Sequence, residues 1–437
     1  MVNKQIFGAV IKIWQVMFFV FIALFGAVLP GQAAVCHPLC TVHYGLNWQE
    51  ANKEEVAAWL AAGGNLHMQS DEASFPLAEA AYFGNVEAAE VLLAAGAPVN
   101  IRDRRDRNIL YYALEGMKNN PVMPVLLRAG ADVNDADREG RAALYHAFNT
   151  GQDRAVIAAL LAAGAEVNRP NKGGTTPLHL ATWYNRNASL VAMLIDAGAD
   201  VRAKDGGGRI PLHFAAWHDE DKQVVLLLLT AGAEVNARDG VGQTPLHYAA
   251  SSNIGSALIT VLLDAGAALN ARDKDGKTPL YYAARSANTP TFFALLRAGA
   301  ETVQDAGGSS IMHAAAMGDN PAIVRAAQEF SPINGKDKQG DTPAHYWARR
   351  GDNPTTLDIL LGFGADINAK NNRERTPLHE AVLRRNQQTM AALLQRQADV
   401  CARDEEGLMP LALASGGFLD EVEDAEILLL RPAACPR

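Results

Sequence analysis

The sequence predicts an all-α solenoid, in which short helix–turn–helix units stack side by side along one axis. The first observation is the phrase "TPLH" at Thr176, Thr244 and Thr376, whose apolar third residue recurs, with variants, every 32 to 34 residues. The second is a phrase of the type "AGADVN" that keeps the same period. The third is a set of helix start and stop signals that accompanies both phrases.

The first helix of each unit opens at the four-residue phrase. Thr176 stands where an N-cap hydroxyl is wanted, and Pro177 fills the first helical position, where its missing N–H costs nothing. His179 then lies close enough to bond back to the cap. The apolar anchors of these first helices are Leu77, Leu110, Leu144, Leu178, Leu212, Leu246, Leu280, Met312, Ala344, Leu378 and Leu411.

The second helix of each unit has its own boundaries. Several begin at a proline that follows Asn or Thr, namely Pro121, Pro290, Pro321 and Pro354. Paired apolar residues such as Leu92-Leu93 give these helices a buried stripe. Each ends at a glycine that can adopt a left-handed conformation, at Gly96, Gly130, Gly164, Gly198, Gly232, Gly266, Gly299 and Gly364.

Six of the eleven histidines share one position in the period, at residues 179, 213, 247, 313, 345 and 379. A catalytic histidine is unique in its chain, whereas these are repeated with the units. We therefore interpret them as structural residues.

The period, "T-P-L-H-x-A" and the closing glycine resemble the ankyrin repeat family over Val42 to the C-terminus. The resemblance implies helix-turn-helix units with short β-hairpin tips, in about eleven repeats over residues 72–437. It also implies a divergent capping repeat within residues 35–71. In this family partners bind a concave face formed by the tips and the first helices.

Composition and motifs limit the function. Apolar residues make up 49% of the chain and the net charge is −9, which argues against a nucleic-acid binder because such proteins need clustered cations. The chain contains no G-x-S-x-G, phosphate-binding glycine loop, H-E-x-x-H or paired C-x-x-C. The repeat spacing leaves no room for an inserted catalytic domain. We expect a monomer that is not an enzyme and uses no cofactor.

Residues 1–34 differ from the rest of the chain. Lys4 and Lys12 are followed by residues that are apolar through Leu29, and small residues end the segment. This pattern predicts a cleaved secretory signal peptide, and the alternative is an uncleaved membrane anchor. We expect the protein in the periplasm or secreted. Because eukaryotic ankyrin arrays are mostly cytosolic, the resemblance points to a bacterial envelope.

The four cysteines lie at the two ends of the chain. The predicted length of the array keeps Cys36 and Cys40 far from Cys401 and Cys435, so we expect the pairs Cys36–Cys40 and Cys401–Cys435. One alternative is an intermolecular disulfide through Cys36 or Cys40. Another is a metal site in the segment "CHPLCTVH", with the candidate ligands Cys36, His37, Cys40 and His43.

Two surfaces are candidates for partner binding. Trp183, Tyr184, Trp217 and His218 follow the first-helix phrases of two consecutive repeats, where small or polar residues are expected. The alternative is that both tryptophans pack onto the neighbouring repeat. A basic edge of predicted tips would suit an acidic segment of a partner, and its residues are Arg104, Arg105, Arg107, Arg138 and Arg141.

The predicted function is non-catalytic protein binding on the concave face, outside the cytoplasm. Two alternatives remain open at this stage. One is an exported effector that binds host proteins, and the other is a metal-handling protein that uses the N-terminal Cys/His segment. In each case a membrane would be contacted only through an uncleaved N-terminal segment.

Overall fold

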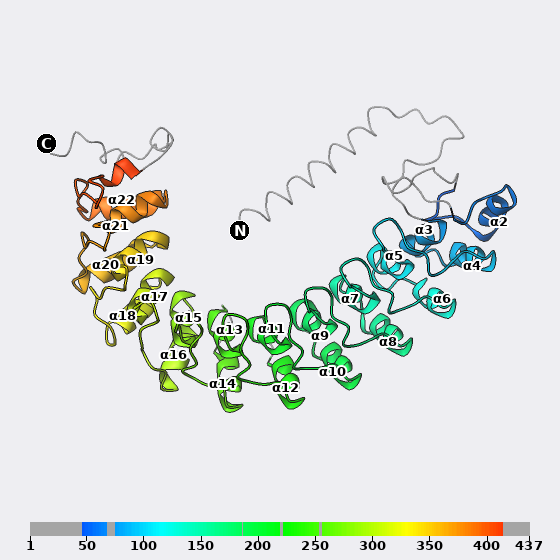
Figure 1. Cartoon of the computed structure of the whole chain (residues 1–437), viewed down its shortest axis with the longest axis horizontal. Helices are drawn as coiled ribbons and strands as arrows, with labels where there is room; N and C mark the ends of the chain where they lie inside the picture. Colours follow the sequence, from blue (N-terminus) through cyan, green and yellow to red (C-terminus); the bar gives the residue numbers. More distant parts are fainter. Residues whose placement is uncertain (1–45, 68–74, 186, 219–221, 253–255, 414–437) are drawn as a thin grey trace.

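The computed structural model describes residues 46–67, 75–185, 187–218, 222–252 and 256–413. Helix pairs stack one after another into a curved array, with α2 at one end and α22 at the other (Figure 1). In each pair the first helix lies on the inner side of the curve and the second helix on the outer side. The all-helical solenoid is therefore confirmed.

The inner layer contains the first helices, each of which begins at the repeated four-residue phrase. These elements are α3 (Pro76–Phe83), α5 (Ile109–Gly116), α7 (Ala143–Asn149), α9 (Pro177–Leu180) with the π-helix η2 (Ala181–Asn185), α11 (Pro211–His218), α13 (Pro245–Ser251), α15 (Pro279–Arg285), α17 (Ile311–Gly318), α19 (Pro343–Arg350), α21 (Pro377–Leu383) and the 3-10 helix η3 (Pro410–Leu413).

The outer layer contains the second helices. These elements are α2 (Lys53–Ala61), α4 (Val86–Ala94), α6 (Met123–Arg128), α8 (Arg154–Ala162), α10 (Ala188–Asp196), α12 (Gln223–Thr230), α14 (Ala257–Asp264), α16 (Thr289–Arg297), α18 (Pro321–Ala327), α20 (Pro354–Gly362) and α22 (Gln387–Gln395). Pro321 and Pro354 open their helices as expected, whereas Pro121 lies two residues before α6. All eight closing glycines have φ between 85° and 91°.

The tips between successive pairs are tight turns, and no strand is assigned in the part of the chain that the structure describes. In the tip before α11, the Asp205 N–H donates to the Arg209 carbonyl at 2.9 Å, and the Asp205 carboxylate accepts from the N–H groups of Gly207 and Arg209. The Gly206 N–H donates to the Gly173 carbonyl of the preceding tip. The tips are thus hairpin-like turns, joined from repeat to repeat, without the expected β-strands.

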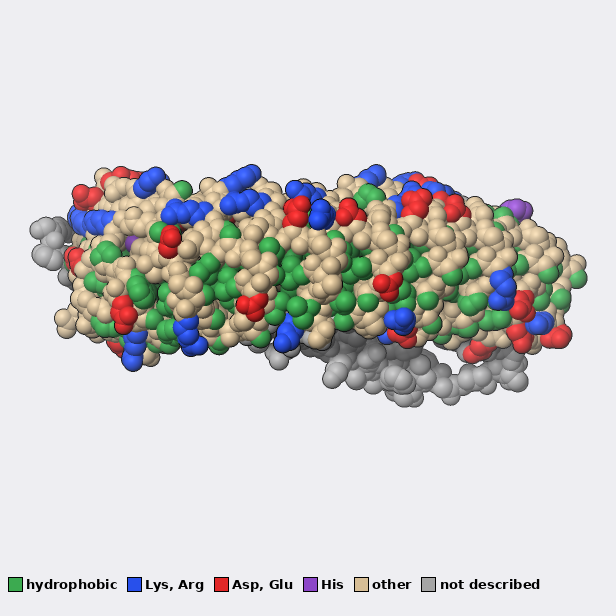
Figure 2. Space-filling view, turned by 90° about the horizontal axis from the view of Figure 1, so that it is seen from below, with side chains coloured by type: hydrophobic (Ala, Val, Ile, Leu, Met, Phe, Trp, Pro, Cys, Tyr) green, Lys and Arg blue, Asp and Glu red, His purple; other side chains and the backbone are tan. Residues whose placement is uncertain are grey.

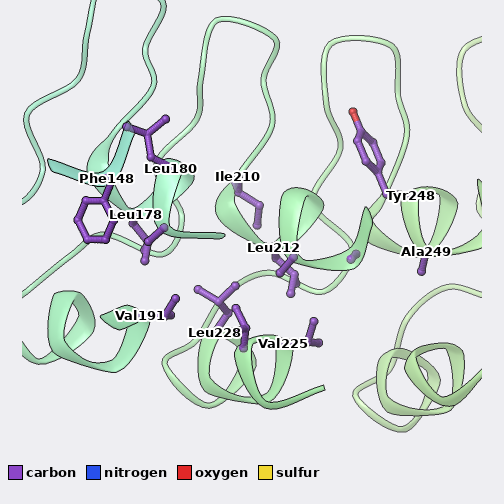
Figure 3. Close-up of a cluster of buried hydrophobic side chains, with 14 of the residues drawn as sticks. Phe148, Leu178, Leu180, Val191, Ile210, Leu212, Val225, Leu228, Tyr248 and Ala249 are labelled. Atoms are coloured by element: carbon purple, nitrogen blue, oxygen red, sulfur yellow. The ribbon is translucent and has the colours of Figure 1, made fainter. Parts of the chain in front are cut away.

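One hydrophobic core runs along the array between the two layers. Figure 3 shows its middle, where Leu178 and Leu212 from the inner helices meet Val191, Val225 and Leu228 from the outer helices. All five side chains are buried. Every repeat therefore buries its apolar surface mainly against its neighbours, which fixes the direction in which the inner helices face.

A ladder of asparagines joins the loops that follow the outer helices, from one repeat to the next along the array. Asn134, for example, donates to the Gly164 carbonyl at 2.9 Å and accepts from the Glu166 N–H at 2.8 Å. Side chains in the same position that bond to the next loop are Asn100, Asn168, Arg202, Asn236, Asn270, Asn334 and Asn368. Each satisfies backbone groups that the end of a helix leaves unpaired.

Candidate functional site

The six repeated histidines bridge neighbouring repeats. His179 Nδ1 accepts from the Thr176 N–H at 3.2 Å, and its Nε2 donates to the Arg209 carbonyl of the next repeat at 3.0 Å. The other five make the same bridge, from residues 213, 247, 313, 345 and 379. Burial lowers the pKa of all six, so the neutral ring is favoured. The structural interpretation of these residues is confirmed.

The predicted tryptophans lie on inner helices in the middle of the array. Trp183 packs edge-on against Phe214, with the ring centroids 5.1 Å apart, and Trp217 packs in the same way against Tyr248 at 5.5 Å. Each tryptophan therefore contacts the next repeat, as the packing alternative expects. We call Trp183, Tyr184, Phe214, Trp217 and Tyr248 the aromatic patch.

The aromatic patch nevertheless presents apolar surface to solvent. Tyr184 is 55% exposed and Trp217 is 39% exposed, whereas Trp183 is half-buried. The ring of Tyr184 lies against that of Trp183, with centroids 6.4 Å apart. Two exposed rings thus lie on the inner side of the array, with Tyr184 supported by Trp183 and Trp217 supported by Tyr248. His218 ends α11, but its side chain lies outside what the structure describes.

A π-helical turn carries Trp183 and Tyr184. Eleven positions separate Thr176 from the N-cap Asn187, whereas ten separate Thr376 from Asn386 in the equivalent turn of α21. The hydroxyl of Thr182 donates to the carbonyls of Leu178 and His179 as the helix widens. The π-helix accommodates one extra residue. The same eleven positions separate Thr342 from the N-cap Asn353, where α19 is an ordinary α-helix, so this length does not by itself predict the π-helical turn.

The predicted basic edge is partly neutralised. Three of its arginines form ion pairs with tip carboxylates: Arg107 with Asp103, Arg138 with Asp106, and Arg141 with Asp137. Burial alone would raise the pKa of Asp103, but hydrogen bonds from Arg107 and Tyr112 outweigh it and hold that pKa below its usual value. The pKa of Asp137 is lowered in the same way by Arg141.

Two arginines of this edge remain available to pair with an acidic group of a partner. Arg104 and Arg105 are exposed, and neither has an ion pair within the described residues. Arg105 lines a cavity of about 340 Å³ together with Arg107, Tyr111, Arg138 and Arg141. Asp137 and Glu139 line it as well, so the edge is less positive than its arginines alone suggest. Attraction of an acidic partner segment stays a prediction.

The cysteine predictions fall mostly outside the described residues. Cys36, Cys40 and Cys435 lie there, as do His37 and His43, so the predicted disulfides and the alternative metal site stay predictions. Cys401 lies in the turn that follows α22. Over residues 46–413, apart from the short gaps given above, no group of three or more potential metal-ligating side chains gathers. No helix in this part of the chain is long and apolar enough to span a membrane.

Family models provide the assignment of this fold. The model for ankyrin repeats in three copies matches residues 47–137, 116–205, 212–305, 286–371 and 344–434. A second model, for ankyrin repeats in many copies, matches residues 184–229. The chain belongs to the ankyrin repeat family. Ankyrin repeat arrays are protein–protein interaction scaffolds and are generally non-catalytic.

Several curated ankyrin repeat relatives are similar over short segments. Inversin of Canis lupus familiaris is 38% identical over 109 residues, which is 24% of this chain and 10% of Inversin. The human transient receptor potential cation channel subfamily A member 1 is 32% identical over 117 residues, 26% of this chain and 10% of the channel. The putative ankyrin repeat protein FPV031 of Fowlpox virus is 44% identical over 80 residues, 17% and 23% of the two chains. The chain therefore spans a small part of each of these relatives.

Proposed function

We propose that this ankyrin repeat protein is a non-catalytic scaffold that binds a protein partner through the aromatic patch, in the periplasm or outside the cell. The observation that carries the proposal is the exposure of Tyr184 and Trp217 on the inner side of the array, where Tyr184 packs against Trp183 and Trp217 against Tyr248. Tryptophan and tyrosine contribute most of the binding energy at many interfaces. The segment of residues 1–34 supports the location, because its pattern is that of a secretory signal.

The packing of the aromatic patch favours binding without rearrangement. The Trp183 ring is held between Tyr184 and Phe214, and Trp217 is held against Tyr248. Side chains that are ordered before binding lose little rotamer entropy when a partner arrives. Arg104 and Arg105 lie several repeats away, so an acidic segment of the same partner would extend along the array to reach them.

The test is a pull-down from a periplasmic extract with the wild-type chain and the double variant Tyr184→Ser/Trp217→Ser. Serine is chosen because Ser251 occupies the position of Trp217 in the next repeat, so the fold tolerates it there. Trp183 is left in place since its removal would open a cavity against Phe214. We expect the double variant to bind the captured partner at least about tenfold more weakly.

A matched control removes an exposed aromatic ring elsewhere. Phe363, which caps α20 in the outer layer, is 37% exposed, and Phe363→Ala should leave binding unchanged. Circular dichroism would confirm that all variants are folded. Equal capture by wild type and by the double variant would remove the aromatic patch as the site. No capture by the wild type would contradict the scaffold proposal.

A further inference from the structure

Each repeat contributes to the inner face the residue that directly follows its histidine position. In four repeats this residue is a tyrosine whose hydroxyl donates to the aspartate of its own tip. The pairs are Tyr112 with Asp103 at 2.8 Å, Tyr248 with Asp239 at 2.8 Å, Tyr282 with Asp273 at 2.7 Å and Tyr346 with Asp337 at 2.8 Å. Each ring thereby covers the face between two tips and satisfies a carboxylate oxygen.

Repeat α17/α18 lacks this ring. Ala314 stands in the tyrosine position and is fully buried. The tip aspartate is still present, and Asp305 Oδ1 accepts from the Ser309 N–H at 2.8 Å. The other carboxylate oxygen of Asp305 has no hydrogen-bond partner among residues 46–413 as far as they are described. In this repeat an acceptor remains where four other tips bind a phenol.

A cavity of about 400 Å³ opens at this place. Its lining includes Asp305 and Ser309 from the tip, Tyr281 and Arg285 from α15, Met317 from α17 and Tyr346 from α19. The equivalent tyrosine of the preceding repeat, Tyr282, lies 5.7 Å from the ring at the histidine position, His247. Tyr281 occupies that histidine position here. In a repeat that has the tyrosine, such as that of Tyr282, an aromatic ring and a tip aspartate flank it. The cavity lies between the same two kinds of neighbour, Tyr281 and Asp305.

Arg285 is the second charged group of the cavity for which the described residues provide no ion pair, and its side chain is exposed. The equivalent Arg349 pairs with Glu380 at 2.8 Å, because glutamate follows the histidine position in the next repeat. In the repeat that follows Arg285 the residue equivalent to Glu380 is Ala314, which offers no carboxylate, and Arg285 forms no ion pair within the described part of the chain. The other two cationic side chains that line the cavity already have partners within the chain. Lys277 pairs with Asp275 at 2.8 Å, and Lys274 donates to the Gly240 carbonyl.

We propose that this cavity binds a tyrosine side chain of a partner segment, with a carboxylate of the same segment paired with Arg285. The phenol donates to the free oxygen of Asp305, as four tyrosines of the chain itself do in their own repeats. Arginine and lysine side chains are disfavoured because Lys274, Lys277 and Arg285 surround the site. The volume lies within the range of small-molecule sites. The inference rests on the proposed scaffold function and adds the chemistry of a second contact.

The experiment uses the methyl signal of Met317, which lines the cavity, in the full chain labelled with ¹³C at methionine methyl groups. Met317→Leu assigns the signal. The probes are N-acetyltyrosinamide, N-acetylphenylalaninamide and N-acetyltyrosine, each titrated to millimolar concentration. We expect saturable shifts with N-acetyltyrosinamide and at least about fivefold weaker binding of the phenylalanine probe, which lacks the hydroxyl donor. N-acetyltyrosine should bind about threefold more tightly than the amide, since its carboxylate pairs with Arg285.

Three variants are matched to residues that the array already carries at equivalent positions. Asp305→Asn imitates the tip residues Asn171 and Asn371 and should weaken the tyrosine probes about tenfold. Arg285→Ser imitates Ser251 and should make the amide and the free acid equal. Ala314→Tyr imitates Tyr282, fills the cavity from within and should abolish binding while the chain stays folded.

Each alternative outcome overturns the proposal. These outcomes are no shift of Met317, equal binding of the tyrosine and phenylalanine probes, and undiminished binding to Ala314→Tyr. None of them depends on the aromatic patch, because no captured partner is needed. Conversely, loss of capture by Ala314→Tyr together with normal capture by Tyr184→Ser/Trp217→Ser would keep the cavity and reject the aromatic patch.

Discussion

A single histidine satisfies polar groups of two repeats at once. His247 Nδ1 accepts from the Thr244 N–H at 3.0 Å, and His247 Nε2 donates to the Lys277 carbonyl at 3.1 Å. Because the ring is fully buried, both backbone groups would otherwise have no partner. The tyrosine substitutes at this position act differently: next to Tyr281, the Thr278 hydroxyl accepts from the helix N–H itself.

We predict that His247→Leu lowers the free energy of unfolding by about 1–3 kcal/mol, since it leaves a buried N–H and a buried carbonyl unpaired. His247→Tyr should cost less, because Tyr281 shows that the fold accepts this ring with the threonine cap retained. Urea unfolding followed by circular dichroism would measure both. A leucine variant as stable as the wild type would show that the bridge adds nothing to stability.

Among the elements, the junction between α16 and α18 differs from all its neighbours. Thr302 stands in the position of the ladder asparagine, and Phe330 stands in the position of the glycine whose carbonyl that asparagine would bind. Two residues after Phe330, Pro332 has no N–H to donate to the asparagine side chain. By comparison, Asn134 makes both bonds across its junction. Three substitutions thus remove the same pair of hydrogen bonds. In a solenoid, where each repeat contacts only its neighbours, this weakens coupling at one point.

We predict that helices α17–α22 unfold in urea separately from helices α3–α16. Hydrogen exchange read by mass spectrometry would show protection lost on one side of residues 302–332 at a lower urea concentration than on the other. The control restores the ladder with Thr302→Asn and the loop of residues 128–133 in place of 328–333, and it should merge the two steps. A single cooperative loss of protection in the wild type would contradict this prediction.

At the scale of the whole molecule, the array accumulates buried neutral histidines. Burial lowers the pKa of each of the six bridging rings, and it lowers the pKa of His146 to about 4 although Asp137 opposes the shift. An unfolded histidine titrates near its ordinary value of 6.5. As the pH falls through that value, the unfolded chain binds protons that the folded chain does not. Stability contributed by these rings is therefore full above 6.5 and is lost as the pH falls toward the lowered values.

We predict that the free energy of unfolding falls by several kcal/mol between about pH 7 and about pH 5. Most carboxylates stay ionised in this range, so they contribute little to the change. Urea titrations at both values, with a third at about pH 8 as the control that should match pH 7, measure the effect. Equal stability at pH 7 and pH 5 would contradict the assignment of neutral buried rings.

The sequence by itself determined the helix pairs, their order and the structural role of the histidines. These follow from local chemistry: Pro177 sets a helix start, Gly198 needs a left-handed conformation, and a histidine repeated with the period is not unique to one site. The family models agree with the same period over most of the chain. The position of Trp183 and Trp217 on the inner side also follows from the repeat pattern.

Only the tertiary structure decided which candidate binding side chains already contact other groups of the chain and which stay accessible to a partner. It pairs Arg107, Arg138 and Arg141 with carboxylates, sets Trp183 against Phe214, and leaves Asp305 and Arg285 facing a cavity. The ion pairs of Arg107 and Arg141 join residues four positions apart within one tip, whereas Arg138 and Trp183 contact residues about one repeat away. The contacts between repeats depend on the rotation between stacked repeats and on the side chain that the neighbour supplies, and no local pattern within one repeat contains that information.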